Sequence, residues 1–164
     1  MIIHPLKPIY NKNSKVLILG SFPSKISRIE NFYYANPNNR FWKIMESLFN
    51  KTLNTIEDKT NFLYENNIAL WDVIHSCEIV SSSDASIKDV KPNDIKLILN
   101  NSQIKAIFLT GKTAFKYYNK YLKNKVNIET FLLPSSSSAN ATYSLDELIN
   151  EYKMILKYIK KNHH

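Results

Sequence analysis

Cysteine and glycine are scarce in this chain of 164 residues: there is one cysteine, Cys77, and there are two glycines, Gly20 and Gly111. One cysteine excludes a disulfide framework, and it equally excludes a zinc or iron–sulfur site held by several cysteines. No apolar run approaches the roughly 20 residues that a membrane helix needs, and the polar, proline-containing residues 1–10 differ from a signal peptide. These absences predict a cytoplasmic protein that does not bind membranes.

Arginine is scarce as well, whereas lysine is abundant, and the net charge is +8 at pH 7. Such an excess of positive charge favours polyanionic partners such as nucleic acids. A lysine-rich codon usage would produce the same charge, so both interpretations stay open. The length and the 44% of hydrophobic residues fit one globular domain. We expect this domain over residues 1–162 and interpret His163 and His164 as the remnant of a tag.

Four near-continuous apolar runs have the length and character of buried parallel strands. They lie at residues 15–19, 68–73, 106–110 and 128–133. Helical patterns lie between and after these runs, at residues 41–49, 57–66, 92–100, 112–122 and 145–160. Strands that alternate with helices predict an α/β fold. We expect a three-layer α/β/α sandwich with a four-stranded parallel sheet.

Both glycines stand at the end of a predicted strand, Gly20 after the first and Gly111 after the third. Ligands of open α/β sheets bind at the carboxyl ends of the strands. Glycine suits a position where the backbone turns sharply or approaches a ligand. A plain tight turn would explain the two glycines equally well.

Three short motifs do not support the chemistry that they suggest at first sight. Residues 111–113 (GKT) lack the earlier glycine of a phosphate-binding loop, because position 106 is Ala106, and we expect them to begin a helix. His75 and Cys77 are only two residues apart and match no catalytic arrangement, so we expect a packed cysteine. The serines at 135–138 lack the Gly-x-Ser-x-Gly pattern of a hydrolase nucleophile.

Two polar segments follow predicted strands and would lie at the same edge of the sheet. Residues 20–24 (GSFPS) come directly after the first strand, and residues 32–42 (FYYANPNNRFW) follow as a loop rich in aromatic and amide side chains. Residues 132–140 (LLPSSSSAN) run from the end of the fourth strand into a second loop. The carboxyl ends of parallel strands share one edge, so the two loops are expected to meet.

These segments resemble the two motifs of the uracil-DNA glycosylase superfamily. The pattern Gly-Ser-Phe-Pro-Ser, followed by Tyr-Tyr-x-x-Pro-x-Asn-Arg-Phe-Trp, is characteristic of its hypoxanthine (deoxyinosine) DNA glycosylase family, and the second loop is similar to that family's Leu-Pro-Ser-x-Ser-Pro-Ala-Asn. Residues 70–73 (LWDV) and residues 83, 84 and 87 also resemble the family. The resemblance extends from about Val16 to the last helix.

The resemblance implies a monofunctional enzyme that hydrolyses the N-glycosidic bond of a flipped, deaminated base in DNA, with hypoxanthine favoured, and that needs no metal or other cofactor. It assigns to Asn39 the catalytic role of holding the water and contacting the base. Tyr34 would stack on the base, and the backbone at Gly20, Ser21 and Phe22 would contact the base edge. A helix cap would equally explain Asn39, and a core position would explain Tyr34.

The resemblance also implies a set of DNA contacts from small hydroxyl residues, backbone amides and a lysine. The expected DNA-binding residues are Ser24, Lys112, Pro134, Ser135, Ser136, Ser137, Ser138 and Asn140. A flexible polar loop and a solvated helix face would explain the same residues. Arg40 is either functional or structural, and Trp42 is expected in the core.

Three other functions remain open at this stage. Within the superfamily, the alternative is an enzyme that removes uracil opposite guanine. Outside it, the alternatives are a non-catalytic nucleic-acid-binding module on the same fold and a small α/β domain that binds a nucleotide. For the favoured function we expect a monomer, with DNA containing a damaged base as its partner and a place at the nucleoid within the cytoplasm.

Overall fold

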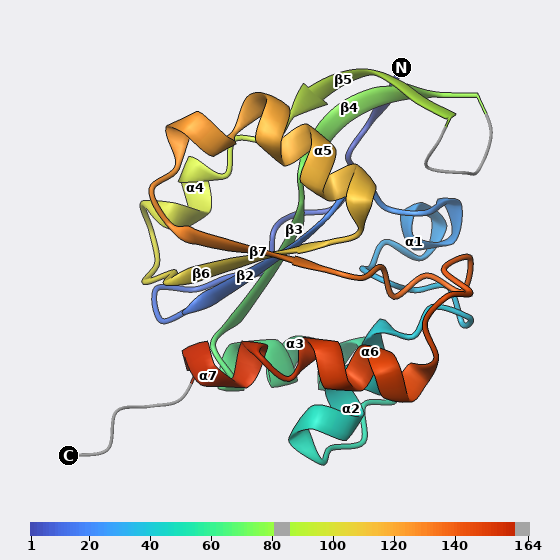
Figure 1. The fold of residues 1–164 in the computed structure, drawn as a ribbon, viewed down its shortest axis with the longest axis vertical. Helices are drawn as coiled ribbons and strands as arrows, with labels where there is room; N and C mark the ends of the chain where they lie inside the picture. The colour runs from blue at the N-terminus through green and yellow to red at the C-terminus, as the bar shows by residue number, and fades with distance from the viewer. Residues whose placement is uncertain (81–85, 160–164) are drawn as a thin grey trace.

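A four-stranded parallel sheet forms the centre of the protein in this computed structural model, which describes residues 1–80 and 86–159 (Figure 1). Its strands are β2 (Val16–Gly20), β3 (Ile68–Asp72), β6 (Ala106–Thr110) and β7 (Glu129–Leu133). The order is β3-β2-β6-β7, and every pairing is parallel. Each residue of β2, β3 and β6 is buried, which is why these strands read as continuous apolar runs. The predicted sheet is confirmed.

Helices cover both faces of this sheet and complete the expected three layers. Figure 1 shows α4 and α5 on one face and α2, α3, α6 and α7 on the other. The helices are α1 (Lys25–Glu30), α2 (Phe41–Phe49), α3 (Ile56–Glu65), α4 (Lys96–Leu99), α5 (Lys112–Tyr121), α6 (Leu145–Tyr152) and α7 (Ile155–Ile159). A short 3-10 turn, η2 (Lys123–Lys125), follows α5. The expected α/β/α sandwich is therefore observed.

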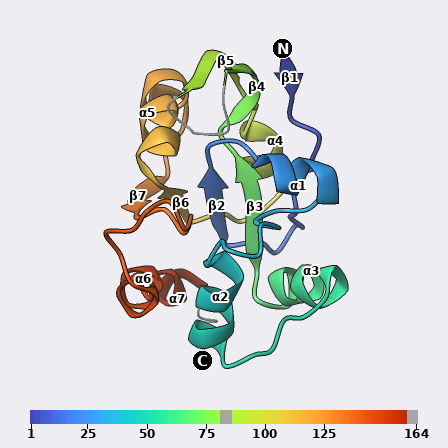
Figure 2. The ribbon, with the colours of Figure 1, turned by 90° about the vertical axis from the view of Figure 1, so that its right-hand side faces the viewer.

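A second, antiparallel sheet was not predicted from the sequence. It has the order β1-β4-β5, from Ile2–Ile3, Ile74–Ile79 and Ile87–Pro92. Figure 2 shows β4 extending beyond the end of β3, from which only Val73 separates it. Half of the residues of β5, namely Lys88, Asp89 and Lys91, are exposed and charged, so no apolar run marked this strand.

Two helix predictions need correction, and one helix was not predicted. The helix expected at 92–100 is shorter in the structure and spans only α4. Pro92 belongs to the end of β5, and the N–H of Lys96, the first residue of α4, donates to Asp94 Oδ1. The helix expected at 145–160 is broken between α6 and α7. The buried residues Leu148, Tyr152 and Ile155 keep helical spacing across the break, so the sequence pattern does not reveal it. Helix α1 was not predicted: it lies between the polar segments 20–24 and 32–42, and Ser24 caps it by accepting the N–H of Ser27 at 3.2 Å.

Trp42 lies in the core, as expected. Its side chain is 6% exposed, stacks on Phe32 with ring centroids 5.7 Å apart, and donates from Nε1 to the carbonyl of Tyr33 at 3.0 Å. These contacts tie the start of α2 to the aromatic segment that precedes it. The familial residues 83 and 84, and the histidines at 163 and 164, lie outside the described residues.

Candidate active site

The two loops singled out in the sequence border one cavity of about 850 Å³. The cavity opens at the carboxyl edge of the parallel sheet, and its walls include residues that follow β2, β6 and β7. Figure 1 shows α1 and the loop after β7 at this same edge. Cavities of roughly 300–1,000 Å³ are typical of small-molecule sites. The cavity is therefore large enough to receive a nucleobase.

Arg40 joins the two loops. Its backbone N–H donates to the carbonyl of Ser136 at 3.0 Å. Its guanidinium donates to the carbonyls of Ser137 at 2.8 Å and Asn140 at 3.0 Å, and also to that of Tyr143. One arginine thus satisfies several carbonyls of a loop nearly 100 residues away. This geometry gives Arg40 a structural role at the site.

Asn39 lies on the cavity wall, half-buried, with its side-chain oxygen held on two sides. Oδ1 accepts the backbone N–H of Phe41 at 2.9 Å and the hydroxyl of Ser136 at 2.8 Å. The N–H of Phe41 can only donate, so this contact fixes which atom of the amide is the oxygen. Nδ2 finds no acceptor within the described part of the chain and is free to donate to a ligand.

Tyr34 is held rigidly beside the cavity. Its ring stacks on Phe41 with centroids 4.0 Å apart and planes within 10°, and its backbone is left-handed at φ 52°. Its hydroxyl lies 3.5 Å from Oγ1 of Thr110. Burial and the nearby charge of Asp72 raise the pKa of the Tyr34 phenol. The hydroxyl therefore stays protonated and can donate a hydrogen bond.

Each glycine has a steric reason at its position. A Cβ on Gly20 would lie 2.6 Å from Oδ1 of Asp72 and 3.3 Å from the hydroxyl of Tyr34. Gly111 has φ 96° at the start of α5, and a Cβ there would lie 3.3 Å from Cβ of Ser135. Gly20 is thus required by a close approach of side chains, and Gly111 by a sharp turn.

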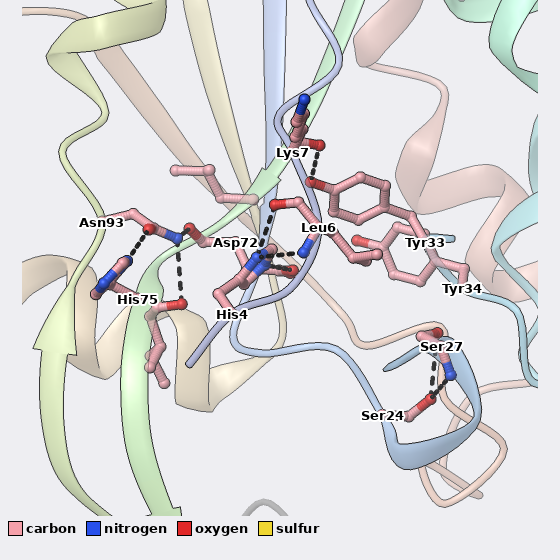
Figure 3. A network of polar contacts seen from close by, with 12 residues as sticks. His4, Leu6, Lys7, Ser24, Ser27, Tyr33, Tyr34, Asp72, His75 and Asn93 are labelled. Atoms are coloured by element: carbon pink, nitrogen blue, oxygen red, sulfur yellow. Dashed lines mark hydrogen bonds and ion pairs between the residues drawn. The ribbon is translucent and has the colours of Figure 1, made fainter. Parts of the chain in front are cut away.

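Asp72 and His4 form a buried, hydrogen-bonded pair at the cavity that sequence reasoning missed. His4 Nε2 lies 2.7 Å from Asp72 Oδ2, and the two side chains are only 2% and 6% exposed (Figure 3). Asp72 is the last residue of β3 and also borders the cavity. The rule that drew attention to Gly20, a residue at the carboxyl end of a buried strand, would have found Asp72 too. No local motif marks His4.

The loop after β7 is braced internally. Asn140 Nδ2 donates to the carbonyl of Ser135 at 3.0 Å, and the carbonyl of Pro134 accepts the hydroxyl of Tyr152 at 2.6 Å. Ser136 is buried with its hydroxyl on Asn39, whereas Ser138 is exposed at the loop tip. Of the serines expected to face DNA, Ser136 therefore points into the protein.

The remaining predicted residues border the cavity in different ways. Ser21 and Phe22 are buried, and the guanidinium of Arg28 lies 5.9 Å from the centroid of the Phe22 ring. Ser24 caps α1 at the rim of the cavity, and Lys112 is exposed at the start of α5. The structure thus brings every predicted site residue to one cavity.

Other chemistries find little support in the described residues. His75 is exposed and Cys77 is buried, so the two do not form a pair. No group of three or more histidine, cysteine or acidic side chains within residues 1–80 and 86–159 could hold a metal ion. In the same residues, no helix has the length and apolar character needed to cross a bilayer.

The fold and the site define an α/β/α protein with a base-sized cavity at the carboxyl edge of a parallel sheet. A family model described as the uracil DNA glycosylase superfamily matches residues 7–161. The chain belongs to this superfamily, as the resemblance of its two loops implied.

Curated relatives and a solved structure agree with this assignment. Two relatives named hypoxanthine DNA glycosylase, from Methanosarcina barkeri and Methanosarcina acetivorans, are 31% and 33% identical to this chain. These matches cover 81% and 88% of this chain, and 85% and 92% of the relatives. A solution NMR structure of an M. acetivorans protein, provisionally named uracil DNA glycosylase, is 30% identical with a TM-score of 0.78, covering 94% of this chain and 99% of its own.

Proposed function

We propose that this protein is a monofunctional DNA glycosylase that hydrolyses the N-glycosidic bond of a deaminated base flipped out of the duplex, and that hypoxanthine is its preferred base. The observation that carries the proposal is the shared cavity of the two loops, which places Asn39, Tyr34 and Ser136 around one base-sized space. The names of the two Methanosarcina relatives support hypoxanthine as the substrate. Their similarity extends over most of this chain.

Asn39 and Ser136 are suited to hold the attacking water between them. Asn39 Nδ2 donates a hydrogen bond to the water oxygen. The Ser136 oxygen accepts a hydrogen bond from the water, because the serine's own O–H is donated to Asn39 Oδ1. Neither group is a strong base. Cleavage through an oxocarbenium-like sugar needs only a weak nucleophile in the right place, so positioning is the main contribution.

Tyr34 supplies the platform for the flipped base. Phe41 supports one face of the Tyr34 ring, so a base would stack on a ring that is already fixed. Stacking of a base on an aromatic side chain contributes about 1–3 kcal/mol. We expect a backbone amide near Phe22, which borders the cavity, to stabilise the negative charge that develops on the departing base.

DNA outside the cavity would contact the exposed parts of the site. Ser138 lies at the tip of its loop, and Lys112 begins a helix whose surface also carries Lys116 and Lys120. Lysines near the phosphates strengthen binding to any sequence by releasing counterions. The net charge of +8 agrees with such a contribution.

Uracil is the second candidate substrate, because the solved neighbour carries a uracil DNA glycosylase name. One experiment separates the candidates: duplexes with hypoxanthine, uracil, xanthine or thymine are incubated with excess protein and then treated with alkali. We expect alkali-labile sites to form fastest at hypoxanthine. Faster cleavage at uracil would mean that uracil, and not hypoxanthine, is the preferred base. DNA binding without alkali-labile product would favour a non-catalytic module.

A further inference from the structure

One oxygen of the buried Asp72 carboxylate has no hydrogen-bond partner among the described residues. Oδ2 is paired with His4, whereas Oδ1 accepts no hydrogen bond from residues 1–80 or 86–159. Asp72 is only 4% exposed, yet it borders the cavity next to Gly20. Oδ1 is not among the fully buried side-chain atoms that lack a partner, so it is accessible from the cavity that Asp72 borders. It can therefore accept a hydrogen bond from a ligand in the cavity.

We propose that Asp72 recognises the ring N–H that deamination creates in a base, and that His4 is the positioning residue that holds Asp72 for this contact. The proposal rests on the proposed glycosylase function and names the group that selects its substrate. Hypoxanthine carries a proton on N1, and uracil, thymine and xanthine carry the corresponding ring N–H. Adenine and cytosine present a bare ring nitrogen there. An ionised carboxylate only accepts hydrogen bonds, so Oδ1 binds the first group and repels the second.

His4 is itself fixed by its surroundings. Its Nδ1 lies 2.9 Å from the carbonyl of Leu6, and its ring meets the edges of Phe22 and Trp71 at centroid distances of 5.7 and 6.4 Å. The backbone N–H of His4 donates to the carbonyl of His75 at 2.7 Å. Figure 3 shows His4 and Asp72 side by side, with Tyr33 and Tyr34 on the side opposite His75. With one oxygen held by His4, the other keeps a fixed direction.

This contact discriminates between some bases and not between others. It separates deaminated bases from adenine and cytosine, but it does not reject guanine, which also has a ring N–H. Exclusion of guanine would depend on the cavity walls near its 2-amino group. A site built around a hydrogen-bond donor of the substrate discriminates strongly against analogues that lack the donor.

The test compares a substrate that has the N–H with one that lacks it. Single-turnover excision is measured for hypoxanthine and for unsubstituted purine, whose N1 is bare, with wild type, Asp72→Ala and the exposed-carboxylate control Asp146→Ala. We expect Asp72→Ala to slow hypoxanthine release about 10- to 100-fold and not to slow purine release, because the carboxylate repels a bare N1. The preference for hypoxanthine over purine should therefore collapse. Asp146→Ala should change neither rate.

Equal losses on both substrates, or no loss on hypoxanthine, would overturn the role of Asp72. If circular dichroism shows that Asp72→Ala does not fold, inhibition of the wild-type enzyme by free bases is measured in place of the variant's excision rates. Free hypoxanthine should then bind at least about 10-fold more tightly than free purine. Equal binding would also overturn the proposal. A wild-type protein that releases no base would instead contradict the proposed function, so the two failures are distinguishable.

His4 is tested by a pair of substitutions. His4→Leu removes the donor to Asp72, and His4→Gln keeps a side-chain N–H. We expect His4→Leu to reduce the preference for hypoxanthine over purine about 10-fold, and His4→Gln to restore part of it. If both variants lower the two rates equally, His4 has only a structural role, and this part of the proposal fails.

Discussion

The hydroxyl of Ser136 donates a 2.8 Å hydrogen bond to the side-chain oxygen of Asn39, although 97 residues separate them. The loop that follows β7 thereby fixes the amide on the opposite wall of the cavity. Two donors occupy Oδ1, from Ser136 and from the backbone of Phe41, so Nδ2 is the atom of Asn39 that faces a ligand. The proposed catalytic centre is thus a pair of residues.

Ser136→Ala is expected to reduce the single-turnover rate of base release about 10-fold, because it removes an acceptor for the water and one of the two restraints on Asn39. DNA affinity should change little, since Ser136 is buried. Ser138→Ala is the matched control, because Ser138 is exposed at the same loop. It should weaken DNA binding and leave the rate at saturating protein unchanged. The reverse pattern would contradict this account of the two serines.

Arg40→Lys is expected to lower stability by about 2 kcal/mol, because an ammonium group cannot reach the several carbonyls that the guanidinium binds. Denaturant unfolding followed by fluorescence measures the change. Arg28→Lys is the control: Nε of Arg28 has no hydrogen-bond partner in the described residues, so a smaller loss is expected. A stability unaffected by Arg40→Lys would mean that the two loops stay joined without this side chain.

Gly20→Ala is expected to alter base selection. The added Cβ would lie 2.6 Å from Asp72 Oδ1, and His4 prevents the carboxylate from moving freely. The preference for hypoxanthine over purine should therefore fall, as with Asp72→Ala. Gly111→Ala, in contrast, forces alanine to φ 96° and should cost about 1–3 kcal/mol of stability. Excision assays and urea unfolding of both variants measure the base preference and the stability. An unchanged preference for hypoxanthine in Gly20→Ala would contradict the role given to the Gly20–Asp72 approach.

Lys112→Ala is expected to weaken DNA binding equally for all sequences. The slope of log K against log salt concentration should decrease by about 1 if the lysine contacts one phosphate. Fluorescence anisotropy over a salt series measures that slope. Lys51→Ala serves as the control, because Lys51 is exposed just beyond α2 and does not border the cavity. An identical slope for both variants and wild type would remove Lys112 from the DNA interface.

The parallel sheet was predictable because β2, β3 and β6 are buried at every residue, which leaves a continuous apolar run for each. Helix α2 was equally plain, with Phe41, Ile44 and Met45 on its buried face. The second sheet escaped prediction because exposed, charged residues interrupt β5 and leave no apolar run there. The break between α6 and α7 escaped because the buried stripe continues through it.

The predicted site residues came from strand ends and from family resemblance, and both sources have limits. The Asp72–His4 pair joins residues 68 positions apart, and the Arg40 contacts join residues about 100 apart. Local patterns carry no signal for such contacts. The burial of Ser136 was also invisible, because four consecutive serines look alike until the loop is folded.

The most direct test of the central claim is the release of free hypoxanthine from an inosine-containing duplex, measured by mass spectrometry for wild type, Asn39→Ala and the neighbouring exposed control Asn38→Ala. The account predicts release by wild type and Asn38→Ala, and a rate at least about 100-fold lower for Asn39→Ala, with fold and DNA affinity retained. Release by Asn39→Ala at the wild-type rate, or no release by wild type while it binds the duplex, would contradict it.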